Sequence, residues 1–451
     1  MIRTPLQVLK SRWRAPLIFF QVYLSVTVWL FFYGPWPWQI DNPLQVFAFL
    51  AAAQVAIAIG YLRSWKRVRA SQTLAFPRDN VANGTRFLKA ALVVTVLLAI
   101  PTSLSRTGSA IPNVVEGLRN TGVVYNENFE RLEVGNPFVV VEYLRMLVSP
   151  WLTAAFPLTV FYWGRLSWSV RLVALAAIGF NLSMYLATGT NKGIADVTVT
   201  LPWLVFLAAA VGIAQPKSFK LKVSIASVAF FAAFLYFFGA GQQQRSGSGS
   251  GSEYGTFFTG ISVLQSDTNN FISSLLPEAL RVIFEAISRY VVHGYYALSL
   301  SFQTDTPSTL GLGNSMFLAR NADLVAGSNY FVNQSIPGVL DRDFGWGMFL
   351  LWHSIYPWLA SDFGFAGTLV VMGALAYLLG LSWGKTLTTA SAPWVVLLYL
   401  LIILFFYVPA NNQVFQSGET CVAFFTVLIW ALRSESRPSR VPARAALQRS
   451  P

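Results

Sequence analysis

Long apolar runs recur from one end of this chain to the other, and they constrain the fold more than any other feature. A helix needs roughly 20 residues to cross the hydrocarbon core of a bilayer. The run from Ala15 to Tyr33 contains no charged residue, and several later runs are similar. Only 11% of the 451 residues are charged, whereas about a quarter is usual in soluble chains. The sequence therefore predicts an all-α polytopic membrane protein.

The limits of these runs predict about ten transmembrane helices. We place the spans at residues 15–33, 43–62, 87–104, 146–163, 172–189, 194–214, 223–241, 366–383, 393–409 and 421–432. The first run is not a cleavable signal peptide, because its apolar part is too long and "FFYGPWPW" offers no small-residue cleavage site. We expect it to remain as a membrane anchor.

The formal net charge of +13 is distributed unevenly across these spans. Segments assigned to one side carry 22 of the 32 basic residues but only Asp79 and Glu435 as acids. The other side carries 10 basic and 17 acidic residues. Cytoplasmic segments are enriched in Lys and Arg, so this asymmetry predicts that both termini are cytoplasmic. The basic charge thus indicates topology, and we expect no nucleic-acid partner.

The chain divides into four parts. Residues 1–241 form an N-terminal bundle of about seven spans, with an outer loop at about 105–142. Residues 242–364 form a large periplasmic loop, 365–432 the C-terminal membrane helices, and 433–451 a basic cytoplasmic tail. The large loop opens with "RSGSGSGSEYG", a flexible tether. Beyond it, helical spacing of apolar residues predicts one or two helices lying along the membrane surface.

Basic residues on the outer side are not explained by the positive-inside rule. Arg281, Arg289 and His293 would lie on one face of a helix. The planar guanidinium group suits pyrophosphate, because it donates two charge-assisted hydrogen bonds at once. Alternatively, the arginines extend toward water and pair with Glu278 and Glu285. His293 is then a packed neutral histidine.

Three further cations and one acid are candidates. Lys192 lies in "ATGTNKGIAD", a tight outer turn, where it either pairs with Asp196 or binds lipid-linked phosphate. Arg106 and Arg119 flank "PNVVEGL" and are either ordinary loop charges or phosphate ligands. Asp362, in "HSIYPWLASDFGFAG", either caps the following helix or acts as a general base or sugar ligand. One Cys and two His cannot form a usual zinc site, and we expect neither metal nor cofactor.

Three of these stretches together resemble a known family. "HSIYPWLASDFGFAGTLVVMGALAYLLG" resembles the segment that closes the large periplasmic loop of Wzy-type oligosaccharide repeat-unit polymerases, the O-antigen polymerases. "YLATGTNKGIADV" is similar to their short outer turn, which often carries Arg where this chain has Lys192. "YVVHGYYALSLSF" is similar to their loop helix with a Tyr and a Gly. The layout of most of the chain agrees, but matches at the level of residues are confined to these stretches.

The resemblance implies a metal-independent membrane glycosyltransferase of GT-C type in a bacterial inner membrane. It would join undecaprenyl-pyrophosphate-linked oligosaccharide repeats into O-antigen or a related surface polysaccharide, beside membrane lipid and a chain-length regulator. An O-antigen ligase or a flippase for lipid-linked sugars is the alternative.

The reaction needs cations for the leaving pyrophosphate, a base for the attacking hydroxyl, and surfaces for sugar rings. The candidate cations are Arg281, Arg289, Lys192, Arg106 and Arg119. The candidate bases are Asp362, His293 and Glu142. The candidate sugar contacts are Tyr290, Tyr356 and Trp352.

Overall fold

The computed structural model describes residues 5–71, 78–213, 255–305 and 308–435, with residues 225, 228–232, 234–239 and 241. Six of the 19 residues of the predicted span at 223–241, the Gly/Ser tether and almost all of the basic tail lie outside the described residues. In the part described, helices dominate and the one sheet is the two-stranded antiparallel pair β1 (Thr256–Phe258) and β2 (Val263–Gln265). The prediction of an all-α protein is confirmed.

The helices form two groups. The bundle helices are α1 (Pro5–Trp13), α2 (Ala15–Tyr33), α3 (Pro43–Arg63), α4 (Trp65–Ala70), α5 (Arg78–Leu97), α6 (Ala99–Thr107), α7 (Val114–Arg119), α8 (Thr121–Val134), α9 (Val139–Leu147), α10 (Ser149–Tyr162), α11 (Trp168–Ala187), α12 (Lys192–Ala210), α19 (Ile355–Thr389), α20 (Ala392–Tyr407) and α21 (Gly418–Glu435). The helical cap comprises β1, β2, α14 (Phe271–Leu275), α15 (Glu278–Ser301), α16 (Met316–Ala326), α17 (Tyr330–Gln334) and α18 (Ile336–Phe344).

Among the described residues, five helical segments are long and apolar enough to cross a membrane, so the chain is a multi-pass membrane protein. They are Leu6–Tyr33, Pro43–Ala70, Trp168–Ala187, Lys192–Ala210 and Ile355–Thr389. Two bent helix pairs raise the number to seven. Helix α20 has 16 residues, and α21 carries Glu419, Arg433 and Glu435, so neither meets the same standard. The predicted spans at 393–409 and 421–432 fall on these two helices.

Two of the spans predicted as single helices are bent. The axis turns by 48° between α5 and α6 and by 66° between α9 and α10. Pro101 follows the first break and Pro150 the second. Proline has no N–H for the helical ladder, and its ring clashes with the carbonyl four residues earlier. The bends turn α6 and α9 away from the directions of α5 and α10.

Small residues let α3 and α19 pack in close contact. A side chain built on Gly60 would place its Cβ 1.9 Å from the carbonyl oxygen of Gly373. Further along the pair, Gly380 faces Ser64 and Gly384 faces Val68 at 2.4 and 2.3 Å by the same measure. Such stripes are typical of helix pairs in membranes, where close backbone approach maximises dispersion contacts.

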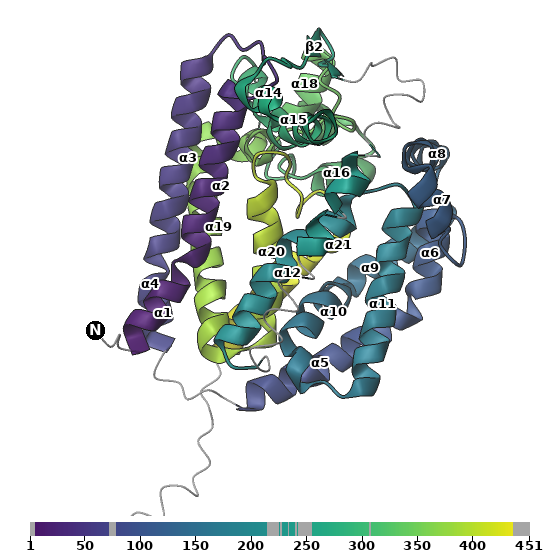
Figure 1. The fold of residues 1–451 in the computed structure, drawn as a ribbon, viewed down its shortest axis with the longest axis vertical. Coiled ribbons are helices and arrows are strands. Elements are labelled where there is room, and N and C mark those ends of the chain that lie inside the picture. The colour runs from purple at the N-terminus through teal and green to yellow at the C-terminus, as the bar shows by residue number, and fades with distance from the viewer. Residues whose placement is uncertain are drawn as a thin grey trace, which may run out of the picture.

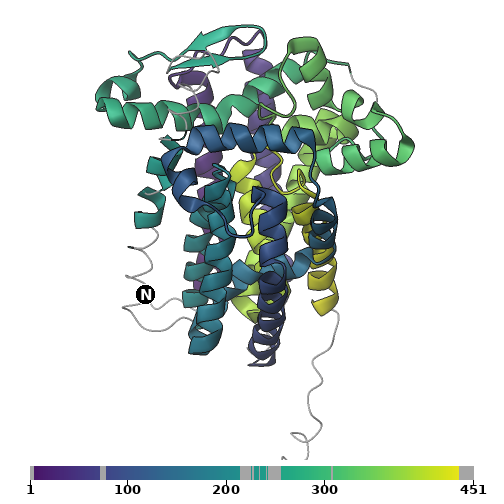
Figure 2. The same ribbon diagram turned by 90° about the vertical axis from the view of Figure 1, so that its right-hand side faces the viewer.

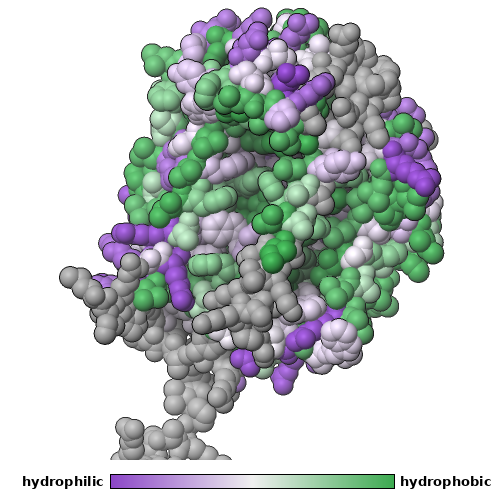
Figure 3. Space-filling model, in the orientation of Figure 1, coloured by the Kyte–Doolittle hydropathy of each residue, from purple (hydrophilic) through white to green (hydrophobic). Residues whose placement is uncertain are grey.

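The helical cap lies across one end of the bundle, as Figures 1 and 2 show, and α15 runs across that end instead of into it. Trp36 donates its indole N–H to the carbonyl of Glu285 at 2.8 Å, and Asn42 donates to the carbonyl of Ser299 at 3.0 Å. A Cβ on Gly294 would lie 2.5 Å from the carbonyl oxygen of Pro409, so glycine permits this crossing. Figure 3 shows that hydrophobic residues occupy much of the middle of one face, with hydrophilic residues toward its two ends.

Candidate functional site

A cavity of about 430 Å³ lies between the bundle helices on the side that carries the cap. Its walls come from α6, α8, α9, α10, α11, α12, α20 and α21, from the α8–α9 and α11–α12 loops, and from the loop that joins α20 and α21. Five charged residues line it: Arg106, Glu142, Lys192, Asp196 and Glu419. Ionisable groups are costly among membrane helices, and they usually face a cavity or one another. Here they do both.

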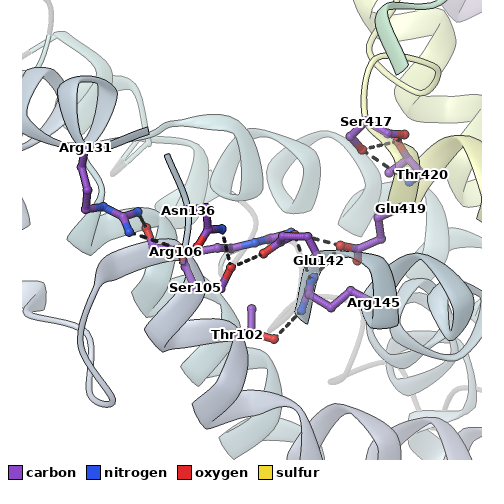
Figure 4. Close-up of polar contacts among 10 residues, drawn as sticks. All are labelled: Thr102, Ser105, Arg106, Arg131, Asn136, Glu142, Arg145, Ser417, Glu419 and Thr420. Atoms are coloured by element: carbon purple, nitrogen blue, oxygen red, sulfur yellow. Dashed lines mark hydrogen bonds and ion pairs between the residues drawn. The ribbon is translucent and has the colours of Figure 1, made fainter. Parts of the chain in front are cut away.

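Two arginines and two glutamates form one ion-pair network, drawn in Figure 4. Glu419 Oε2 lies 2.5 Å from Arg145 Nη2 and 3.1 Å from Arg106 Nη2. Glu142 Oε2 lies 3.5 Å from Arg106 and 3.8 Å from Arg145. Arg145 also donates to the Thr102 hydroxyl at 2.7 Å and is 95% buried, since its exposed fraction is 5%. Arg145 therefore lies behind the network, while Arg106 lies at the cavity wall.

Polar contacts fix the end of α6 that carries Arg106. The Ser105 hydroxyl donates to Glu142 Oε1 at 2.8 Å and accepts from the Asn136 amide at 2.9 Å. Arg131 on α8 donates to the backbone carbonyls of Ser105 and Arg106. These carbonyls belong to the last turn of the helix, where the acceptors lack helical partners and a cation is favourable. The backbone at Arg106 is thus fixed by Arg131 of α8 and, through the Ser105 hydroxyl, by Glu142 of α9.

Lys192 and Asp196 add the third cation and the third acid. They lie one turn apart on α12, whose first residue is Lys192. Within the part of the chain that the structure describes, Lys192 has no ion pair within 4 Å, so the predicted pairing with Asp196 is absent. Asp196 is 9% exposed, and its Oδ1 accepts no hydrogen bond. The Lys192 ammonium group is available to an anion in the cavity.

Local sequence explains why these charges meet. Helix α6 ends at Gly108, whose φ of 74° is left-handed, so Arg106 falls in the last turn. Glu419 falls in the first turn of α21. Cations at helix C-termini and acids at N-termini are both stabilised by the helix dipole. The tight turn before Lys192 uses Gly189, whose φ is 61°.

The structure brings together three of the predicted site residues, Arg106, Lys192 and Glu142, in this cavity. The predicted cations of the loop helix are elsewhere. The Arg289 guanidinium lies 5.4 Å from the ring of Trp36 and 5.0 Å from that of Phe257, inside the cap. Arg281 lies two turns earlier on the same helix, and Arg119 is exposed at the end of α7. None of these three lines the cavity.

His293 is packed within the cap. Its Nδ1 lies 3.0 Å from the carbonyl of Arg289, and its Nε2 accepts the backbone N–H of Trp352 at 2.9 Å. Burial lowers the pKa of this imidazole to about 3, so it is neutral, with Nδ1 carrying the proton. Both ring nitrogens are occupied. The geometry therefore gives His293 the structural role and leaves no lone pair for a substrate proton.

Asp362 binds a loop and does not begin a helix. Its Oδ1 accepts hydrogen bonds from the Thr309 hydroxyl and the Gly311 N–H, and its Oδ2 accepts two from Asn314. Asp362 lies inside α19, just before Gly364, where the backbone leaves helical geometry at φ 62°. We expected Asp362 to cap the helix that follows it. That prediction is wrong, because the backbone N–H groups that donate to its carboxylate belong to the loop at 309–314. Four donors occupy the carboxylate, which is a poor arrangement for a general base.

The predicted sugar contacts lie in an aromatic cluster. The ring centres of Tyr290 and Trp352 are 4.1 Å apart, with 63° between the ring planes. Tyr356 is 1% exposed and stacks near Tyr295 with 6.5 Å between ring centres. In this structure their ring faces contact protein, and none of the three lines the cavity.

Sequence reasoning did not select Arg145 or Glu419 for the site, and it treated Asp196 only as a partner of Lys192 and not as a cavity residue. Arg145 and Glu142 border a predicted span, three residues apart, which was a detectable sign of an intramembrane pair. Glu419 opens the last apolar run in "GETCVAFF". Nothing in the sequence shows that residues 145 and 419 meet. That contact depends on the bend between α9 and α10.

Groups of three or more possible metal ligands do not occur among the described residues. No family model matches the chain, and neither do curated proteins or solved structures. The site must therefore be interpreted from its own chemistry.

Proposed function

We propose that the chain is a membrane glycosyltransferase that polymerises polyprenyl-pyrophosphate-linked oligosaccharide repeats at the outer face of a bacterial inner membrane. The observation that carries the proposal is the cavity in which Arg106 and Lys192 lie beside three carboxylates on the cap side of the bundle. The charge asymmetry of the sequence supports an outward-facing cap. The resemblance to O-antigen polymerases supports the substrate class.

The charges of the cavity suit a lipid pyrophosphate that leaves during the reaction. Arg106 presents a planar donor fork, and its contact with Glu142 at 3.5 Å is the longer of its two ion pairs. A phosphate oxygen can replace that contact while Glu419 and Arg145 keep theirs. Lys192 has no ion pair to exchange within the described residues. These two cations would stabilise the negative charge that develops on the leaving group.

The proposal also accounts for the shape of the site. The cavity opens among membrane helices, where a polyprenyl chain can stay in lipid while its headgroup enters. The cap extends the polar surface above it, where a growing glycan can lie. Excluding water around the reacting groups strengthens each electrostatic contact.

A reconstituted assay tests the proposal. The purified chain in lipid vesicles is given undecaprenyl-pyrophosphate-linked repeats alone, and products are separated by length. Wild type is expected to lengthen them. Arg106→Ala and Lys192→Ala each remove one stabilising charge, and we expect a loss of about 10²–10³-fold in rate.

The matched control is Arg342→Ala. Arg342 is an exposed arginine on the cap that pairs with its neighbour Asp343 at 2.7 Å, so full activity is expected. No lengthening by wild type would contradict the proposal. If product formed only after a lipid A core acceptor was added, the chain would instead be a ligase. Movement of intact repeats between leaflets without any lengthening would indicate a flippase.

A further inference from the structure

The three cavity carboxylates differ in how their charges are compensated. Glu419 lies 3.1 Å from Arg106 and 2.5 Å from Arg145. Glu142 accepts the Ser105 hydroxyl and lies within 4 Å of both arginines. Both glutamates therefore serve to position the arginines.

Asp196 is the exception among the three. It lines the same cavity, has no ion pair within 4 Å in the described chain, and leaves Oδ1 without a hydrogen bond although it is 91% buried. Buried polar atoms without partners are uncommon in folded proteins and often mark functional groups. No neighbouring arginine neutralises Asp196, and its backbone is held within α12.

We infer that Asp196 is the catalytic base that receives the proton of the acceptor hydroxyl. The inference rests on the proposed function. The acceptor oxygen attacks the anomeric carbon of the donor and forms the new C–O bond. The bond from that carbon to the pyrophosphate oxygen breaks, and its electron pair leaves with the pyrophosphate toward Arg106 and Lys192. The hydroxyl proton passes to the Asp196 carboxylate, which later releases it to water.

The surroundings of Asp196 suit this role. Lys192 acts on it from its own helix, and the Tyr407 hydroxyl on α20 is a hydrogen-bond partner of its carboxylate, so the atom without a partner is Oδ1. Tyr399, Tyr185 and Glu419 line the cavity beside it, from α20, α11 and α21. Lys192 lies one turn before Asp196, so the leaving-group cation and the proton acceptor lie on one rigid helix. Such fixed spacing is what a transferase needs, because one group acts at the bond that forms and the other at the bond that breaks.

The test uses the full chain in vesicles with the lipid-linked repeat. Asp196→Asn keeps the shape of the side chain, and we expect its single-turnover rate to fall by about 10²–10⁴-fold, with binding of undecaprenyl pyrophosphate unchanged. Wild type should lose activity on acidification as its carboxylate is protonated, whereas the residual rate of the variant should not follow that limb. Asp196→Glu should recover part of the rate, and Asp343→Asn on the exposed cap should leave it intact.

Two results would overturn the inference. An Asp196→Asn variant that keeps the wild-type rate, or the same acidic limb at a lower rate, assigns the base to another group while the proposed function stands. A folded wild-type chain that binds the lipid but never lengthens it overturns both. The thermal unfolding temperature of each variant separates loss of chemistry from loss of fold.

Discussion

Arg145 shows how one buried side chain can organise a site that it does not face. Its guanidinium contacts Thr102 on α6, Glu142 on its own helix and Glu419 on α21. Removing one partner from a buried ion-pair network leaves the others uncompensated, which is much more costly than the net contribution of the pair. Arg145 therefore fixes both glutamates, and they in turn hold Arg106 at the cavity wall.

The two histidines of the chain predict how stability depends on pH. His353, just before α19, is 1% exposed, and burial lowers its pKa to about 3, as it does for His293. The unfolded chain protonates both near pH 6.5, whereas the folded chain resists protonation. Stability is therefore complete above that pH and is lost as the pH falls toward 3. We expect a loss of about 2 kcal/mol per histidine between pH 7.5 and pH 5.

Thermal unfolding in detergent at a series of pH values measures this loss. The double variant His293→Gln, His353→Gln is the control, since it should be less stable at neutral pH but less sensitive to acid. An unfolding temperature that falls equally in wild type and double variant between pH 7.5 and pH 5 would assign the effect to other groups.

The sequence could indicate which charged residues are candidates for a site, but it could not indicate which groups they contact. The positive-inside pattern selected Arg106 and Lys192 as candidate phosphate ligands, and the structure places both at the cavity wall. The same reasoning selected Arg289, which contacts two aromatic rings in the cap. A cation over an aromatic ring and a cation that binds phosphate have the same sequence pattern. Only tertiary contacts distinguish them.

At the scale of the elements, the packing of α3 on α19 gives a sharp expectation. Gly60→Ala places a methyl group 1.9 Å from the Gly373 carbonyl oxygen, so the helices must separate. Overpacking of this kind costs about 1–3 kcal/mol. The matched control is Gly179→Ala in α11, where the added Cβ meets nothing within 4 Å.

Thermal unfolding and the yield of folded protein in detergent compare the two alanine variants. We expect the Gly60 variant to unfold at a lower temperature. The Gly179 variant should equal wild type or exceed it slightly, because alanine favours helix. Equal unfolding temperatures would show that α3 and α19 tolerate a wider separation.

The bent helices explain why the site was harder to predict than the fold. The apolar runs gave the positions of most spans, because length and hydropathy depend on local sequence. The bends at residues 98 and 148 lie just before Pro101 and Pro150, and their angles depend on how the two helix halves pack against other helices. In the sequence, Arg106 and Arg145 simply follow and precede two separate predicted spans. Their shared contact with Glu419 is visible only in the bent helices of the structure.

For the whole molecule, the topology can be checked by chemical labelling. The native Cys421 is 2% exposed, so a Cys421→Ser background removes it with little change to the surface. Single cysteines are then placed at exposed Ser274 in the cap and at exposed Ser167 before α11. In intact cells whose outer membrane has been made permeable, a membrane-impermeant maleimide should label position 274 and leave position 167 unlabelled.

Permeabilising the inner membrane as well should expose position 167 and so serves as the control. Labelling of position 167 alone in cells with an intact inner membrane would place the cap in the cytoplasm. The outward site and the proposed transferase function would then both fail.

The length of α19 has a consequence for the distance between membrane and cap. Its 35 residues are divided by the break at Gly364. The part after the break, residues 365–389, would extend about 38 Å at 1.5 Å per residue, more than the roughly 30 Å of hydrocarbon. Before the break, Asp362 ties the helix to the loop at 309–314 of the cap region. The segment before Gly364 is therefore fixed to the cap, and Gly364 is the point at which it joins the longer part of α19.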